Sequence, residues 1–433
     1  MKNKEHICNA LLLILIIFEN LFLYIFFRNG LLSQGKNAIG LFLSSLLFGI
    51  VLIYKFYDGT ASVAEVKHHS NKLLQYSVII LFSVRLVILG FQYNSFFQTH
   101  PIAFFNSDIL PQIQIISKRF LAGAFPYSII NDFGFAQHVT YLPLFWLPFT
   151  TAEMLHIDYR WISFGVWCIA ALWLCVRSSR IPSAALRIFI PVLLLASYYI
   201  LFTQNNTIME ATVEVLIAGY YMMFITSLTL RNGILQGTII SICLLSRYSL
   251  VLWLPLYCFV LFVLQSRKRL YAAIGTILVL ILVVYIIPFL SKDWTTLYSG
   301  YKYYDDGTLF EWTHLNKDHK PLQLFAGTGY AYYFYTRFAN LEVIDRIRLL
   351  QKVHAISCVM ITVILTTWFW FNRKRINDKI FLLSSFKIYL AIFLFLIQIP
   401  YEYLMCVGNF VSIAIFCEQA RYRLIPKAAT VST

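Results

Sequence analysis

Residues 267–290 read RKRLYAAIGTILVLILVVYIIPFL, so three basic residues precede a long run of uncharged, mostly apolar residues. An α-helix needs about 20 such residues to cross the hydrocarbon core of a bilayer. Basic residues beside apolar runs gather on the cytoplasmic side of a membrane. The stretch therefore predicts a transmembrane helix that leaves the cytoplasm near residue 270.

The composition of the whole chain agrees with this interpretation. Of its 433 residues 59% are hydrophobic and 13% are charged, whereas a soluble domain has about 45–50% and about 25%. A soluble enzyme is therefore excluded. Basic cytoplasmic loops account for the net charge of +15, so we expect no nucleic-acid partner. The eight cysteines form no CxxC pair and lie mostly in apolar runs, which argues against a zinc site or a disulfide framework.

Apolar runs separated by basic clusters predict an all-α polytopic bundle of about twelve transmembrane helices in one domain, residues 1–433. The expected spans are 9–27, 37–56, 74–92, 141–156, 160–176, 185–203, 208–229, 236–265, 270–290, 352–372, 380–399 and 402–419. Basic clusters place residues 373–375 and 421–427 in the cytoplasm. Residues 93–138 and 291–350 then form two long extracytoplasmic loops, and residues 352–433 form the C-terminal helices.

The topology of residues 139–265 has two solutions. Twelve spans leave three arginines outside, against the charge rule: Arg177, Arg180 and Arg231. The alternative makes 139–176 a single crossing with a re-entrant stretch and splits 236–265 into two short halves around Arg247, which brings those arginines inside. We expect twelve spans, because they give ordinary helix hairpins.

Asp108 is a candidate for chemistry, because it is the only acid between Glu65 and Asp132. It stands where the chain leaves the third expected span, beside an apolar surface, and a carboxylate in such a place suits a general base. An aspartate three residues before Pro111 suits a helix N-cap or a turn equally well. The residues alone leave both interpretations open.

The two outer loops also carry candidate cations and aromatic rings. Lys118 lies in residues 111–125, whose apolar spacing predicts a helix on the membrane surface, and simple anchoring would explain this lysine equally well. Lys317 and His319 are able to contact a phosphate, or are solvated loop residues. The tyrosines of the second loop, Tyr304 among them, suit a sugar site or an aromatic belt.

Ionisable residues inside the expected spans are costly, at about 2.5–3.5 kcal/mol near the midplane. Glu210 and Glu214 are four residues apart and would share one helix face, and Arg247 lies in another span. The three residues pair with one another, bind a substrate phosphate through Arg247, or form a proton relay through the two acids. The sequence does not decide between these roles.

Several motifs within residues 100–255 resemble the GT-C superfamily of polytopic glycosyltransferases, and most of all its polyprenyl-phosphate-mannose-dependent group. The motifs are Asp108 after an early span, Gly123-Ala124-Phe125-Pro126-Tyr127, Tyr141-Leu142-Pro143-Leu144, Thr203-Gln204-Asn205-Asn206, and Gly237 to Pro255 with Arg247 inside it. The chain departs from that group at Thr203, where glycine is usual, and at Arg247, where lysine is common. Residues 291–350 also lack the group's Asn-Gln-Ser.

The resemblance implies an inverting glycosyltransferase with Asp108 as general base. It would transfer a hexose, with mannose as the expected sugar, from a polyprenyl-monophosphate donor to a lipid-linked or cell-surface glycan. The expected donor-phosphate ligands are Arg247, His319, Lys317 and Lys118. The expected substrate-pocket residues are Tyr127, His138, Tyr141 and Tyr304. Because cations would stabilise the leaving phosphate, we expect no metal and no cofactor.

We expect a monomer in contact with membrane lipids, in a bacterial inner or plasma membrane, with its active site on the extracytoplasmic face. One alternative is a transporter or flippase of lipid-linked glycan, with Glu210, Glu214 and Arg247 as its coupling site. Another is an O-antigen polymerase or ligase, which would act on diphosphate-linked oligosaccharides. No internal repeat of the transporter kind is visible in the sequence.

Overall fold

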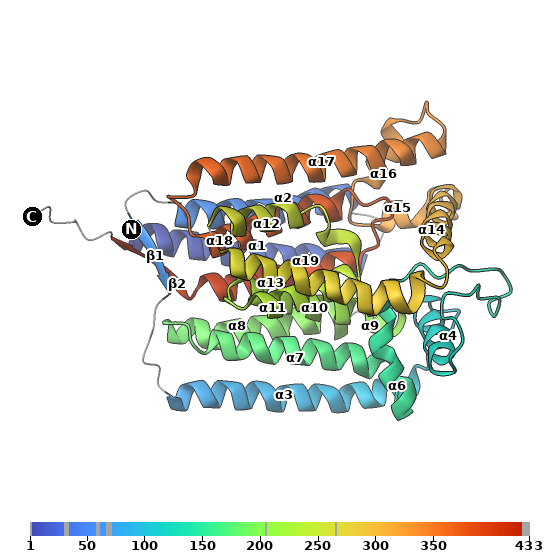
Figure 1. Cartoon of the computed structure of the whole chain (residues 1–433), viewed down its shortest axis with the longest axis horizontal. Coiled ribbons are helices and arrows are strands. Elements are labelled where there is room, and N and C mark those ends of the chain that lie inside the picture. Colours follow the sequence, from blue (N-terminus) through green and yellow to red (C-terminus); the bar gives the residue numbers. More distant parts are fainter. Residues whose placement is uncertain are drawn as a thin grey trace, which may run out of the picture.

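The computed structural model describes residues 2–29, 34–57, 61–65, 72–203, 206–264 and 266–426, and Gln204, Asn205 and Lys427 lie outside them. Within these residues the fold is a helix bundle with one two-stranded sheet (Figure 1). The helices along the bundle are α1 (Lys2–Asn29), α2 (Gln34–Phe56), α3 (Lys72–Thr99), α7 (Arg160–Ser178), α8 (Ala184–Tyr198), α10 (Glu214–Leu228), α11 (Gly233–Leu244), α12 (Leu254–Val263), α13 (Arg267–Ile281), α17 (Val343–Asn372), α18 (Asp378–Phe395) and α19 (Leu404–Gln419). The remaining helical segments are α4 (Ile109–Leu121), α5 (Pro143–Trp146), η2 (Leu147–Phe149), α6 (Thr150–Leu155), η3 (Tyr199–Thr203), α9 (Asn206–Ala211), η4 (Tyr248–Leu250), η5 (Leu282–Leu290), α14 (Thr295–Thr313), α15 (Leu322–Ala326) and α16 (Ala331–Arg337).

The described residues include seven helices that are long and apolar enough to cross a membrane. They are α1, α2, α3, α7, α8 with η3, α13 with η5, and α17. The outer helix α3 exposes large apolar side chains, such as Leu81 at 69% and Phe91 at 74%. In a membrane protein such side chains face lipid. By the length and composition of its helices, the chain is a membrane protein.

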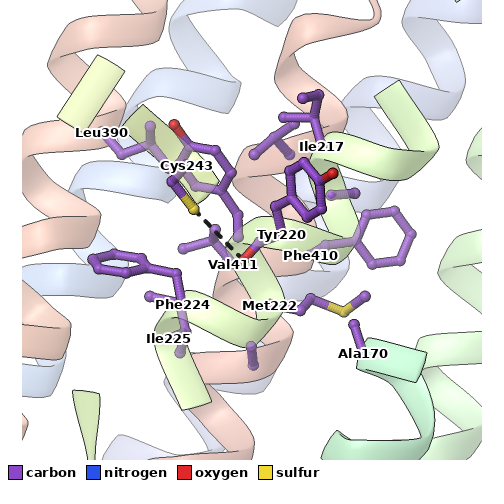
Figure 2. Close-up of a cluster of buried hydrophobic side chains, with 14 of the residues drawn as sticks. Ala170, Ile217, Tyr220, Met222, Phe224, Ile225, Cys243, Leu390, Phe410 and Val411 are labelled. Atoms are coloured by element: carbon purple, nitrogen blue, oxygen red, sulfur yellow. Dashed lines mark hydrogen bonds between the residues drawn. The ribbon is translucent and has the colours of Figure 1, made fainter. Parts of the chain in front are cut away.

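The centre of the bundle is formed by α10, α18 and α19, which are buried on nearly all sides. A helix that is apolar all round belongs in such a place. Figure 2 shows Tyr220 and Phe224 of α10 among side chains of α11 and α19. There the thiol of Cys243 donates to the carbonyl oxygen of Tyr220 at 3.7 Å. The described cysteines are all free and buried or half-buried, as expected for small core residues.

The two ends of the bundle differ (Figure 1). The strand end carries the start of α1 and the antiparallel pair of β1 (Ala61–Glu65) with β2 (Tyr422–Pro426). The opposite end, called here the loop end, carries α4 and α6 together with α14, α15 and α16. Both segments predicted as long loops therefore lie at the same end of the molecule. Both contain helices, and α17 already begins at Val343.

Two of the twelve expected spans are not single long helices, and a third, 208–229, is divided between α9 and α10. Residues 141–156 form three short helical segments, because Pro143 and Pro148 each start a new one. Residues 236–265 divide into α11 and α12 with a break around Arg247, and 12 and 10 residues make helices only about 15–18 Å long. The twelve-helix count is therefore not confirmed.

Two features of the middle of the chain agree with the alternative arrangement: the break around Arg247 and the position of Arg177. Arg177 ends α7 at the strand end, where its Nε donates to Glu418 Oε1 at 2.7 Å. Glu418 also accepts from Arg421 at 2.9 Å, and Arg421 pairs with Glu65 of β1. Arg177 thus lies beside the two strands, which is where the charge rule would put it.

Two glycines let the short helix α11 pack closely against α13. A Cβ atom at Gly237 would lie 2.5 Å from the carbonyl oxygen of Ala273, and one at Gly233 would collide with the carbonyl oxygen of Arg269. Small residues spaced by four allow the backbones of membrane helices to approach in this way. The glycine noted in the sequence at position 237 therefore has a packing role.

Single cysteines at Asn232 and Lys317 test this arrangement, because both side chains are exposed and they lie at opposite ends of the bundle. In intact cells, we expect a membrane-impermeant maleimide to label the cysteine at 317 and to reach the one at 232 only after permeabilisation. The protein without added cysteines serves as the control. Labelling of both positions from the same side would contradict the fold as described.

Candidate functional site

A cavity of about 2050 Å³ lies at the loop end. Its wall is built from the start of α4, residues 135–145, the α9–α10 junction, η4, α14, α17 and the α18–α19 connection. Ligand pockets usually measure about 300–1,000 Å³, so this cavity is larger than a usual ligand pocket. Five of the predicted site residues lie in its wall: Asp108, Tyr127, Tyr141, Arg247 and Tyr304.

Asp108 stands at the N-cap position of α4, yet its carboxylate makes no capping bond to the helix. Its Oδ2 accepts instead from Gln112 Nε2 at 2.7 Å and from Gln137 Nε2 at 2.9 Å. Its other oxygen, Oδ1, accepts no hydrogen bond from the described residues. The capping interpretation is therefore wrong for the side chain, and one carboxylate oxygen remains available in the cavity wall.

Arg247 forms an ion pair with Glu214, and the two side chains are 21% and 2% exposed. Glu210 does not join them, because α9 ends at Ala211 and a new helix begins at Glu214. Glu210 accepts from the Asn106 amide instead. The expected shared helix face of the two glutamates is therefore wrong, and pairing between Arg247 and Glu214 is the arrangement that the structure contains.

Tyr127 fixes residues 141–146 through two hydrogen bonds of its hydroxyl group. Its hydroxyl donates to the Tyr141 carbonyl oxygen at 3.1 Å and accepts from Trp146 Nε1 at 3.2 Å. The Tyr141 ring stacks on Phe145, with 4.5 Å between the ring centroids. Burial, and after it the charge of Asp108, raises the pKa of the Tyr141 hydroxyl. Asp108 and Tyr141 both line the cavity.

The break between α11 and α12 is tied to this segment. The Leu144 amide donates to the carbonyl oxygen of Leu245 at 2.9 Å, one turn before η4. Ser249 of η4 shares a hydrogen bond with Tyr221 of α10. These contacts hold Arg247 against the same cavity as Asp108.

Four other predicted residues lie outside the cavity wall. The His138 ring lies 5.8 Å from that of Tyr303, which does line the cavity. Lys118 is exposed; it follows Gln112 by six residues and so lies about 120° from it around α4. The helix packs on α6 and η2, and Ile113 and Ile116 are buried, whereas Phe120 and Leu121 at its end are 37% and 43% exposed.

Lys317 and His319 belong to a tight exposed turn after α14. His319 has a φ of 55°, and its amide donates to the Asn316 carbonyl oxygen at 3.0 Å. The Asn316 side chain accepts from the Lys320 amide at 3.1 Å. The turn is built from its own backbone, and neither cation reaches the cavity.

Several wall residues were not among the predicted site residues. Glu311 accepts from the Tyr401 hydroxyl at 3.3 Å, and Glu402 follows it along the wall. Burial raises the pKa of Glu311, and the charge of Asp108 acts in the same direction. Among the described wall residues there are five carboxylates and one arginine. The excess of acidic over basic side chains in the wall therefore disfavours binding of a polyanion.

Gln112 was recoverable from the sequence, since it follows Asp108 by one helical turn. Gln137 lies 29 residues from Asp108, and no local pattern connects them. His354 of α17 also lines the cavity, and its buried Nε2 has no partner among the described residues. The sequence around His354 does not predict that this residue lines a cavity.

Comparison of the chain with protein-family models, curated proteins and solved structures finds no match. The site must therefore be judged by its own chemistry. A carboxylate with one available oxygen faces a cavity that also holds an arginine, several tyrosines and buried amides. Such a set can accept a proton, stabilise one negative charge and bind hydroxyl groups.

Substitution Glu311→Gln tests the electrostatics of the wall. Because burial raises the pKa of Glu311, its ionised form is disfavoured in the fold, and stability is lost as pH rises through that pKa. We expect the variant to melt at a higher temperature than the parent at pH 8, and this difference to vanish near pH 4. Thermal unfolding in detergent measures it. The exposed Glu342→Gln serves as the control, and an E311Q difference that does not change with pH would contradict the prediction.

Proposed function

We propose that the chain is an inverting glycosyltransferase that works at the extracytoplasmic face of a membrane. It would transfer a hexose, mannose in the first instance, from a polyprenyl monophosphate to a lipid-linked or cell-surface glycan. The proposal includes a polytopic arrangement in a bacterial inner or plasma membrane, and membership of the GT-C superfamily.

The observation that carries the proposal is the state of Asp108. Its carboxylate is held through Oδ2 and keeps Oδ1 available in the wall of a large cavity at the end of a membrane bundle. A polyprenyl chain stays in the bilayer, so its sugar phosphate can reach only a site near the membrane boundary. Tyr141, Tyr303 and Tyr304 supply rings and hydroxyls of the kind that bind sugars.

The proposed reaction is a single displacement at the anomeric carbon. Oδ1 of Asp108 takes the proton of the acceptor hydroxyl as its oxygen forms the new bond to that carbon. The bond from the carbon to the phosphate oxygen breaks, and polyprenyl phosphate leaves with the bonding electrons. Attack from the face opposite the phosphate inverts the configuration.

Arg247 is the candidate ligand for the donor phosphate, because it is the one arginine or lysine among the described wall residues. A guanidinium has five N–H donors, so it can bind Glu214 and a phosphate oxygen together. Stabilising the charge on the departing phosphate lowers the barrier directly. Lys118, Lys317 and His319 are not part of this proposal, because their side chains lie outside the wall.

The acid-rich wall bears on the choice of donor. Five carboxylates and one arginine suit a donor with one negative charge better than a diphosphate. This disfavours an O-antigen polymerase or ligase, whose substrates are diphosphate-linked. A flippase of lipid-linked glycan would need no general base, so loss of the base separates it from a transferase.

Substitution Asp108→Asn should lower the rate of sugar transfer by about 10²- to 10⁴-fold, which is the usual contribution of general-base catalysis. The assay uses purified protein in nanodiscs with a polyprenyl-monophosphate mannose donor and a glycan acceptor. Asp132→Asn is the matched control, since Asp132 is exposed in the same external segment and lies outside the wall.

Transfer by the Asp108→Asn variant at the parent rate would disprove the base assignment. Movement of lipid-linked glycan by both forms, with transfer by neither, would instead identify a transporter.

A further inference from the structure

The segment between α3 and α5 contains Asp108 and both of the glutamines that donate hydrogen bonds to its carboxylate. Asp108 precedes α4, Gln112 lies one turn into that helix, and Gln137 lies beyond the turn that returns the chain to the bundle. The two glutamine side chains are 2% and 3% exposed, so both are almost fully buried. No residue of another segment is needed to fix the carboxylate.

Both glutamines are held in place by backbone hydrogen bonds that do not involve the Asp108 carboxylate. Gln112 belongs to α4, and its backbone amide donates to the Asp108 carbonyl oxygen at 3.0 Å. The backbone of Gln137 exchanges two hydrogen bonds of 2.9 Å with Ile130. The turn between them contains Gly134 with a φ of 81°, a left-handed conformation that glycine adopts at little cost. The two amide groups therefore reach Asp108 from fixed positions.

The orientation of the two amides fits an ionised carboxylate. Each Nε2 donates to Asp108 Oδ2, while the Oε1 atoms of Gln112 and Gln137 are buried without a partner among the described residues. A protonated Asp108 would offer an O–H donor to such an oxygen. Leaving two buried amide oxygens unpaired is costly. Both amides instead turn their N–H groups toward Oδ2.

We propose that Gln112 and Gln137 are positioning residues that hold Oδ2 of Asp108 and direct its free oxygen Oδ1 to the acceptor hydroxyl. This inference rests on the proposed function. Hydrogen bonds from N–H groups favour the charged form of a carboxylate. Because both bonds go to one oxygen, they also fix the rotation of the carboxylate and leave Oδ1 to receive the proton.

Other ionisable groups face Asp108 across the cavity. Its charge acts on Tyr303 and Glu311 of α14, and on Tyr141 and Tyr403. Arg247 acts on Tyr141 in the opposite direction. None of these side chains is changed by substitution of the two glutamines, so a change in the pH dependence of Asp108 chemistry reports on the amides.

The test replaces Gln112 and Gln137 by methionine, which has a similar length and no N–H donor. We expect the acid limb of the kcat profile for sugar transfer to move up by about one pH unit for each amide removed. The KM of the polyprenyl-monophosphate donor should stay the same, because the proposed ligand of the donor phosphate is Arg247 and not either glutamine. Gln112→Glu should move the limb further, since two neighbouring carboxylates repel each other.

A second measurement does not depend on transfer. A carbodiimide modifies protonated carboxyl groups, and mass spectrometry follows the modification of Asp108 as a function of pH. The midpoint should move up in the methionine variants by the same amount as the acid limb. The control is Gln236→Met, which removes a fully buried amide at the strand end and should leave both profiles in place.

Equal loss of rate at every pH, with an unchanged modification profile, would show that the glutamines are merely structural and would overturn the inference. If the parent protein transfers no sugar, the proposed function fails instead. In that case the carbodiimide profile still tests whether Gln112 and Gln137 act on Asp108. Failure of the inference and failure of the proposed function are therefore distinguishable.

Discussion

The site depends on the two hydrogen bonds that hold one oxygen of Asp108. A carboxylate at a membrane boundary is costly unless donors compensate its charge, and here two buried amides do so. Because both bonds go to Oδ2, the second oxygen stays available in the cavity wall. The same two hydrogen bonds therefore hold the carboxylate and leave its second oxygen available in the cavity.

The irregular parts of the fold gather around this carboxylate. The prolines at 143 and 148 break the chain into short helices, and α11 and α12 stop short of a full crossing. The Leu144 amide joins the two breaks by its bond to Leu245. As a result, Arg247 reaches the cavity paired with Glu214, while the regular helices around it supply the apolar body of the bundle.

Away from the cavity, the bundle contains a buried ion pair. Lys387 and Glu19 form a fully buried pair at 2.8 Å inside the bundle, and Ser45 donates to the same glutamate oxygen at 2.7 Å. A buried charge is tolerated when its partners surround it in this way. Glu19 Oε2 likewise has no partner among the described residues, but it is buried inside the bundle, whereas Asp108 lines the cavity at the loop end.

The sequence predicted the features that follow from local pattern. Apolar length and basic flanks indicated helices such as α13 and α17, and the alignment of two long segments on one side followed from the same charges. The sequence could not show that Glu210 and Glu214 belong to different helices, because no proline or glycine marks the break. The contact between Asp108 and Gln137 depends on the turn at Gly134 and on long-range packing, which no single-sequence pattern records.

The most direct test of the account is a structure of the protein in nanodiscs with a non-transferable polyprenyl-monophosphate sugar analogue. The account predicts that the phosphate contacts Arg247 and that the anomeric carbon lies in the cavity with its open face toward Asp108 Oδ1. An analogue bound at the strand end, or one whose sugar lies on the far side of the cavity from Asp108, would contradict it.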